Sequence, residues 1–133
     1  MTWEELNEVR ILNKNIDDIT TEINSLRRSL SAKTPALDGL PKSTSVSSSV
    51  ERNAIRIADA EKALEELKLR LAEAIPRLEK KIRDEVKNPI TRVIFLFRYV
   101  DCMFFSDIAF KIGYSKQHVY SLHNTTYRNL LNR

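Results

Sequence analysis

The residues with the clearest capacity for chemistry lie near the C-terminus, around a glycine that follows a short amphipathic segment. Gly113 can adopt the left-handed conformation that ends one helix, and Ser115 can cap the helix that follows. Ala109 is small enough to let two helices cross closely. The apolar residues on both sides of this turn have the spacing of a shared core, and they are Ile108, Ile112, Val119 and Leu122. The pattern predicts a helix-turn-helix unit.

The second helix of this unit would present polar side chains and no acidic residue. Such side chains can bond the base edges of double-stranded DNA, and an α-helix fits the major groove. We therefore predict DNA contacts from residues on this helix and from two further cations. The predicted DNA-binding residues are Ser115, Lys116, Gln117, His118, Tyr120, Ser121, Asn124, Lys111 and Arg128.

The charge of the chain is distributed in a way that agrees with a polyanionic partner at one end. The net charge is +4, and residues 1–88 contribute none of it, because their Lys and Arg equal their Asp and Glu in number. Residues 89–133 carry six Lys or Arg against two acids, and they also hold every aromatic residue except Trp3. A basic segment joined to a neutral one favours nucleic-acid binding by the basic segment.

The neutral segment has the pattern of two long helices. Thr2 and Glu5 form a capping-box pair, and apolar residues then recur with 3, 4, 3, 4 spacing to Leu30, which predicts a helix over about 2–32. Residues 34–49 are rich in Pro, Gly and Ser and predict a loop, in which Leu37 and Leu40 could pack.

A second capping box at Ser48 and Glu51 predicts the start of the next long helix. Its heptad seam runs from Ile57 to Leu78, and we expect Pro76 to kink this helix without ending it. Asn88-Pro89 predicts the boundary with the next segment.

These elements predict an all-α fold: an antiparallel helical hairpin, or coiled coil, over 1–88 and a three-helix helix-turn-helix unit over 89–133, which opens with an apolar helix at 90–101. The second long helix has more apolar residues than one partner helix needs, so either a second hairpin or the C-terminal unit should cover them. We also expect a homodimer built mainly from residues 2–86. The apolar residues outside its seam are Ile55, Leu69, Ile75 and Ile82.

Other classes of function receive little support from the residues. No apolar run approaches the roughly 18 residues of a membrane span, and the N-terminal residues do not resemble a signal peptide, so we expect a cytoplasmic protein. Cys102 is a single cysteine that we expect to be small and buried, and the spacing of His118 and His123 does not suit zinc, so hydrogen bonding or packing is expected of them. We expect neither an enzyme nor a cofactor.

The stretch from Phe105 to Leu122 resembles region four of bacterial sigma factors, in which Ile-Ala, Gly and Ser precede a basic recognition helix. The whole chain resembles small phage and prophage late-gene regulators of the ArpU/RinA kind. The resemblance implies that Lys116, Gln117, Tyr120 and Ser121 face base edges. The chain departs from these proteins at two positions, Cys102 where Gly is common and Phe104 where a capping Ser or Thr is common, and Ser106 could cap in place of Phe104.

Three functions remain open from the sequence. The first is a sequence-specific transcription regulator that binds double-stranded DNA as a homodimer and could also contact RNA polymerase. The second is a coiled-coil interaction factor whose C-terminal motif binds RNA polymerase or a host protein. The third is a phage DNA-packaging factor similar to small terminase subunits, although those usually place the DNA-binding module first in the chain.

Overall fold

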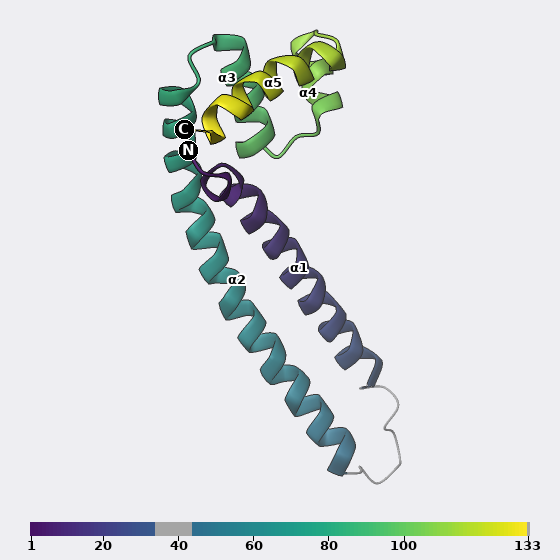
Figure 1. Cartoon of the computed structure of the whole chain (residues 1–133). Helices are drawn as coiled ribbons and strands as arrows, with labels where there is room; N and C mark the ends of the chain where they lie inside the picture. The colour runs from purple at the N-terminus through teal and green to yellow at the C-terminus, as the bar shows by residue number, and fades with distance from the viewer. Residues whose placement is uncertain (34–43, 133) are drawn as a thin grey trace. The chain divides into compact units, whose positions relative to one another are not determined.

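The described residues of the computed structural model, 1–33 and 44–132, form helices and no β-strand, which confirms the predicted all-α class. None of the helices in these ranges has the length and apolar character needed to span a membrane. The elements, drawn in Figure 1, are α1 (Trp3–Lys33), α2 (Thr44–Glu85), α3 (Pro89–Phe95), the π-helical segment η2 (Leu96–Val100), α4 (Phe105–Ile112) and α5 (Lys116–Leu131).

Helix α1 begins with the capping box that the sequence predicts. The backbone N–H of Glu5 donates to Thr2 Oγ1 at 3.1 Å, and that of Thr2 donates to Glu5 Oε2 at 2.9 Å. These bonds satisfy backbone donors that have no partner within the helix. The hydrogen bond from the Lys81 side chain, followed by that from the Thr2 backbone, lowers the pKa of Glu5 to about 2.

Helix α2 begins earlier than the sequence predicts. The expected loop at 34–49 is wrong for residues 44–49, which are helical, and Ser48 lies inside the helix rather than at its cap. Extending a formed helix adds one hydrogen bond per residue, and serine costs only a few tenths of a kcal/mol relative to alanine. A long helix can therefore extend through a serine-rich segment. The rest of the expected loop, including Leu37 and Leu40, lies outside the described residues.

Helix α2 passes through Pro76 and ends at Glu85, so the proline does not stop it, as predicted. A helix boundary at Asn88-Pro89 is also confirmed, since α3 begins at Pro89. Asn88 has extended backbone angles, and its Oδ1 accepts from the N–H groups of Ile90 and Thr91 at 2.9 and 3.1 Å. Proline at the first helical position loses no hydrogen bond, because its missing donor would have no partner there.

The helix predicted over 90–101 changes geometry part-way. It is α-helical from Pro89 to Phe95 and π-helical from Leu96 to Val100, where the N–H of Asp101 donates to the Leu96 carbonyl at 3.1 Å. A π-helical turn holds an extra residue, so it rotates the side chains that follow. Phe95, the last residue of α3, and Tyr99, within η2, are both buried.

The chain divides into two compact units, one formed by residues 1–13 and 70–133 and the other by residues 14–69. The boundary predicted between 88 and 89 does not coincide with this division. In the first unit α1 reaches the C-terminal segment, since Asn13 Nδ2 donates to Cys102 Sγ at 3.4 Å. The opening turns of α1 therefore share a unit with α3, α4 and α5.

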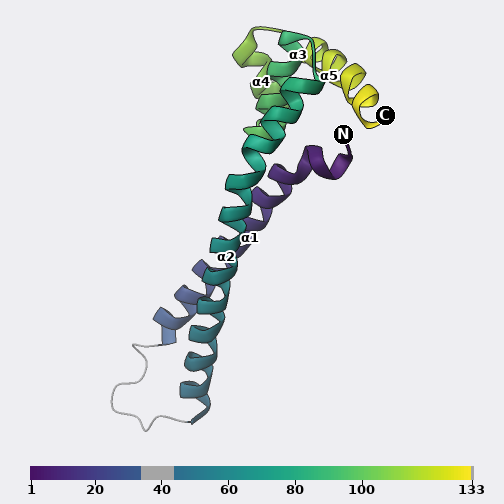
Figure 2. The same ribbon diagram turned by 90° about the vertical axis from the view of Figure 1, so that its left-hand side faces the viewer.

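Ion pairs link α1 and α2 within each unit. In the first unit Arg77 Nη2 bonds both carboxylate oxygens of Glu8, at 2.8 and 2.9 Å, and Lys81 pairs with Glu5. In the second unit Arg27 pairs with Glu61. Both views of the chain show the two helices running alongside each other within these units (Figures 1 and 2). The side chains of these pairs are solvent-exposed, so each pair contributes little to the stability of the fold.

Burial differs between the two units. In the first unit α1, α2 and the residue that follows α2 contribute several side chains with almost no exposed area: Leu6, Val9, Leu12, Ala74, Leu78, Ile82 and Val86. In the second unit the predicted seam is mostly half-buried, and Ile23 is its fully buried member among the described residues. Two helices alone cannot cover each other's apolar stripe completely. Ile82, predicted as spare apolar surface, is covered in the first unit, whereas Ile55 and Leu69 remain exposed.

We expect the turn between α4 and α5 to depend on the left-handed backbone of Gly113, whose φ is +77°. A Cβ at this position would meet no atom within 4 Å, so a substitution costs backbone strain and no clash. Gly113→Val should lower the free energy of unfolding by about 1–2 kcal/mol, and Gly113→Asn by less, because asparagine tolerates this conformation. Urea denaturation measures both values, and equal losses for Asn and Val would contradict the role given to the backbone.

Candidate nucleic-acid interface

The connection between α4 and α5 is a tight three-residue turn held by backbone bonds. Gly113 has the left-handed conformation, and its N–H and that of Tyr114 both donate to the Ala109 carbonyl, at 3.0 and 3.1 Å. Ser115 is extended, and its Oγ accepts from the His118 N–H at 3.2 Å. The capping roles predicted for Gly113 and Ser115 are therefore confirmed.

A small apolar core lies beneath this turn. Ile108, Ala109 and Val119 are buried together with Ile94 from α3, and Ile112 and Leu122 pack against them, as the spacing predicts. Helix α4 contacts α5 and η2, while α3 contacts α5 as well. Helix α5 is thus held by two other helices, and its outer face is fixed relative to them. Figure 2 shows α3, α4 and α5 gathered beside the C-terminal end of α2.

The start of α4 differs from the expectation. Ser106 does not cap the helix; Phe104 occupies the N-cap position with an extended backbone, and no side chain bonds the first turn there. The helix therefore begins at Phe105 and is not shortened. Asp107 in the first turn places negative charge near the positive end of the helix dipole, which favours this start.

Cys102 has a φ of +57°, a left-handed conformation that L residues rarely adopt. Glycine adopts this conformation without the steric cost that a side chain adds. The side chain is half-buried and not buried as expected. Its Sγ accepts the hydrogen bond from Asn13 and thereby contacts α1.

Every residue predicted to bind DNA is solvent-exposed in the structure. On α5 the 4, 3, 4 spacing of Gln117, Ser121, Asn124 and Arg128 places these residues on one stripe of the helix. Lys116 lies beside this stripe, with its Nζ 5.7 Å from the ring centre of Tyr120. His118 lies toward the turn, 5.1 Å from the Tyr114 ring.

The cations of residues 89–133 divide into structural and exposed ones. Arg92 donates to the carbonyls of Val86 and Lys87, at 3.0 and 3.2 Å, and so binds the connection that follows α2. Arg98 donates to the Met103 carbonyl at 3.0 Å and stacks 4.4 Å from the Phe105 ring. Burial lowers the pKa of Arg98. The exposed cations are Lys111, Lys116 and Arg128, while Arg133 lies outside the described residues.

An aromatic cluster around His123 was not predicted from the sequence. The imidazole of His123 stacks on the rings of Phe95, Tyr99 and Tyr127, with centroid distances of 5.0, 5.7 and 5.3 Å. It also makes an edge contact with the Phe105 ring, at a centroid distance of 4.8 Å. The 4, 3, 4 spacing of Val119, His123, Thr126 and Leu130 marks the buried stripe of α5 and could have placed His123 inside. The spacing alone does not predict which rings contact His123, because Phe95, Tyr99 and Phe105 belong to other helices.

His123 is bonded through both ring nitrogens, in agreement with the hydrogen bonding expected of it. Nε2 lies 2.6 Å from the Tyr99 hydroxyl, and Nδ1 lies 3.0 Å from Asn124 Oδ1. Burial lowers the pKa of His123, the bond to Asn124 opposes this shift, and the charge of Arg98 adds to it. Burial also raises the pKa of Tyr99, so its phenol stays protonated.

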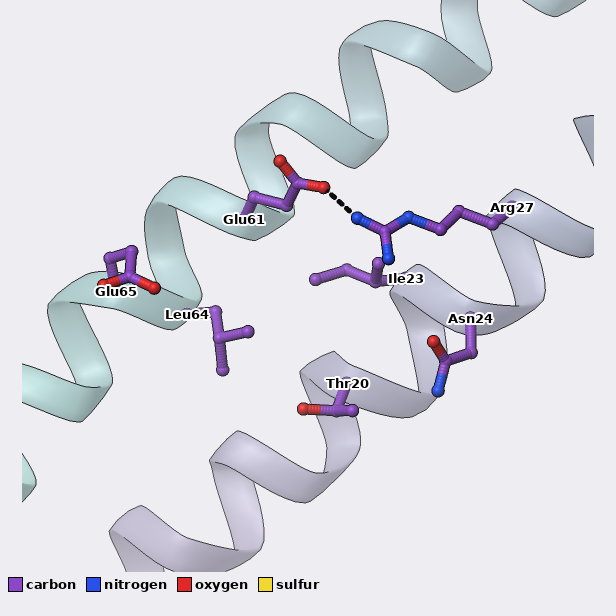
Figure 3. A pocket seen from close by; sticks show the side chains of 7 residues that line it. All are labelled: Thr20, Ile23, Asn24, Arg27, Glu61, Leu64 and Glu65. Atoms are coloured by element: carbon purple, nitrogen blue, oxygen red, sulfur yellow. Dashed lines mark hydrogen bonds and ion pairs between the residues drawn. The ribbon is translucent and has the colours of Figure 1, made fainter.

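A solvent-open groove of about 380 Å³ lies between α1 and α2 in the unit of residues 14–69 (Figure 3). It is lined by Thr20, Ile23, Asn24, Arg27, Glu61, Leu64 and Glu65. Arg27 and Glu61 pair with each other across it, so they neutralise each other and do not converge on a ligand. No group of three potential metal ligands occurs among the described residues.

Comparison of the chain with family models, with curated proteins and with solved structures finds no match.

We expect His123 to make stability depend on pH. Because burial holds its pKa below the ordinary value of about 6.5, the unfolded chain binds a proton that the folded chain resists. The free energy of unfolding should be highest above about pH 7 and should fall as the pH drops through 6.5. Urea denaturation between about pH 7.5 and 5.5 measures this slope.

The matched variants are His123→Gln and His118→Gln, which remove the buried and the exposed imidazole in turn. His123→Gln should be less stable at neutral pH and should lose most of the slope, whereas His118→Gln should retain it. A slope that persists in His123→Gln would assign the pH dependence to other groups.

Proposed function

We propose that the chain binds double-stranded DNA through α5 and acts as a transcription regulator, as its resemblance to phage and prophage late-gene regulators implies. The observation that carries this proposal is the exposed stripe of α5. It is polar and free of acids, and the opposite face is buried against α3 and α4. A helix that is packed against two others in this way can enter the major groove as a rigid element.

The charges support an electrostatic contribution to binding. The exposed cations Lys111, Lys116 and Arg128 lie on α4 and α5, and no acidic residue follows Asp107 in the chain. Cations near phosphates release counterions, which gives affinity without sequence information. Arg92 and Arg98 are engaged with backbone carbonyls, so we assign them no phosphate contact.

The polar residues of the stripe support sequence recognition. Gln117 can bond adenine in a bidentate manner, and Tyr120 and Ser121 can reach adjacent bases or phosphates. All three are exposed and lie within the first two turns of α5, the part of a recognition helix that usually contacts bases. We assign contacts with the DNA phosphates to Ser115 and His118, which lie at the start of α5.

We further propose that the chain dimerises, because one recognition helix reads too short a site to select it in a genome. Ile55 and Leu69 are 61% and 66% exposed, and they lie two heptads apart on the same face of α2. Residues 1–88 are neutral by count, so two copies would not repel there. Apolar residues at this spacing suit a second helical hairpin.

A second candidate function is binding to a protein such as RNA polymerase. Phe110 on α4 is 91% exposed and Phe104 at its start is 72% exposed. Aromatic side chains are enriched at protein interfaces, where their burial contributes much of the affinity. This surface could act together with DNA binding or replace it.

The decisive test of DNA binding is its dependence on salt. We expect DNA fragments selected from a random pool to bind more weakly as salt rises, because counterions are released on binding. Lys116→Ala should flatten the slope of log affinity against log salt by about one unit. Fluorescence anisotropy at several salt concentrations measures the slope.

Lys62→Ala is the matched control, since Lys62 is an exposed lysine on α2 in the neutral segment. It should leave the slope unchanged. Binding that is independent of salt, or equal losses in the two variants, would favour the protein-binding function.

The dimer is tested by introducing charge at its expected interface. The full chain should sediment as a dimer at micromolar concentration, and Ile55→Glu with Leu69→Glu should make it monomeric, because charges are costly in an apolar interface. Asn15→Glu with Thr21→Glu adds the same charge at exposed polar positions of α1 and should remain dimeric. A monomeric wild-type chain would contradict the proposal.

A further inference from the structure

A hydrogen-bonded chain connects the buried cluster to the exposed stripe of α5. The Tyr99 hydroxyl lies 2.6 Å from His123 Nε2, and His123 Nδ1 lies 3.0 Å from Asn124 Oδ1. Tyr99 and His123 are buried, whereas Asn124 is exposed. These two hydrogen bonds therefore connect Tyr99 in η2 to a residue on the outer face of α5.

The direction of these bonds follows from the chemistry of the groups. An amide oxygen only accepts hydrogen bonds, so His123 Nδ1 must carry the proton that it donates to Asn124 Oδ1. In the neutral imidazole Nε2 then has a lone pair, and the Tyr99 hydroxyl donates to it. The low pKa of His123 and the high pKa of Tyr99 both favour this neutral arrangement.

The arrangement fixes which way the Asn124 amide faces. Its oxygen is turned toward the imidazole, so the planar amide directs its NH₂ group away from the ring. Asn124 Nδ2 makes no hydrogen bond within the described residues, and the side chain is exposed. A free asparagine can present either its oxygen or its NH₂, but this one presents donors.

We propose that Tyr99 and His123 hold Asn124 as a hydrogen-bond donor for acceptor atoms of DNA, which are phosphate oxygens, guanine O6 and N7, or thymine O4. The proposal rests on the proposed DNA-binding function. In this proposal Asn124 only donates hydrogen bonds, either to a base, which gives specificity, or to a phosphate of the DNA backbone. The buried Tyr99 and His123 are positioning residues. Adenine, which an asparagine reads with both its oxygen and its NH₂, is disfavoured at this position.

The first experiment examines the network in the free full-length protein. Nitrogen-15 NMR of the imidazole should show His123 as the neutral tautomer with the proton on Nδ1. Tyr99→Phe should disturb the His123 resonances, whereas Tyr127→Phe should not, since Tyr127 stacks on the ring while the Tyr99 hydroxyl bonds it. A proton on Nε2 in the wild type would overturn the proposal without any reference to DNA.

The second experiment is a double-mutant cycle for DNA affinity. Asn124→Ala should weaken binding about 2- to 12-fold, the loss of one hydrogen bond. Tyr99→Phe should weaken it by a smaller factor in the wild-type chain and should have no effect in the Asn124→Ala chain, because it acts through Asn124. Independent losses would show that Tyr99 is merely structural and would overturn the proposal.

The third experiment tests the polarity of the contact. Asn124→Asp retains the oxygen that accepts from His123 but replaces the NH₂ by an acceptor. Thr125→Asp adds the same charge at the next exposed residue. We expect Asn124→Asp to lose more affinity than Thr125→Asp, and equal losses would contradict a donor role.

Selection of bound DNA separates the two sources of acceptors. If Asn124→Ala relaxes the preference for guanine or thymine at one position, the acceptor is a base. If it weakens all sequences equally, the acceptor is a phosphate; both results support the donor role. A wild-type chain that binds DNA while the cycle is additive would refute this inference alone, whereas no DNA binding at all would refute the proposed function with it.

Discussion

The burial of one face of α5 is the constraint on which the candidate site depends. Val119, His123 and Leu130 recur at helical spacing and are almost fully covered by the other helices of their unit. Because a helix has one fixed period, covering this stripe determines which residues point outward, and Gln117, Ser121 and Asn124 are among them. The capped turn at Gly113 and Ser115 then sets the direction in which α5 leaves α4.

The buried stripe is not purely apolar, and this has consequences for the surface. A histidine inside an aromatic cluster must satisfy its ring nitrogens, since a buried polar group without a partner costs about 1–3 kcal/mol. Tyr99 satisfies one nitrogen from the inside and Asn124 satisfies the other from the outside. The demand for hydrogen bonds thus links a buried residue to a surface one and orders the exposed amide of Asn124.

The long helices serve the two compact units differently. In residues 1–13 and 70–133 they contribute side chains to a well-covered core, and Arg92 binds the connection between α2 and α3. In residues 14–69 two helices alone leave Ile55 and Leu69 exposed. A surface of this kind is where a second copy would reduce the exposed apolar area, which is why we place self-association there.

Local patterns in the sequence were enough to predict the all-α class, the capping box at Thr2, the boundary at Pro89 and the turn at Gly113. Each of these depends on a few neighbouring residues whose conformational preferences act over one or two turns. The start of α2 was predicted wrongly, because serines favour loops locally but a long helix extends through them cooperatively. The exposed stripe of α5 also followed from helical period.

Only the tertiary structure decided that Arg92 and Arg98 are structural, that α1 joins the C-terminal unit, and that Tyr99 meets His123. These facts depend on contacts between residues far apart in the chain, which local spacing does not encode.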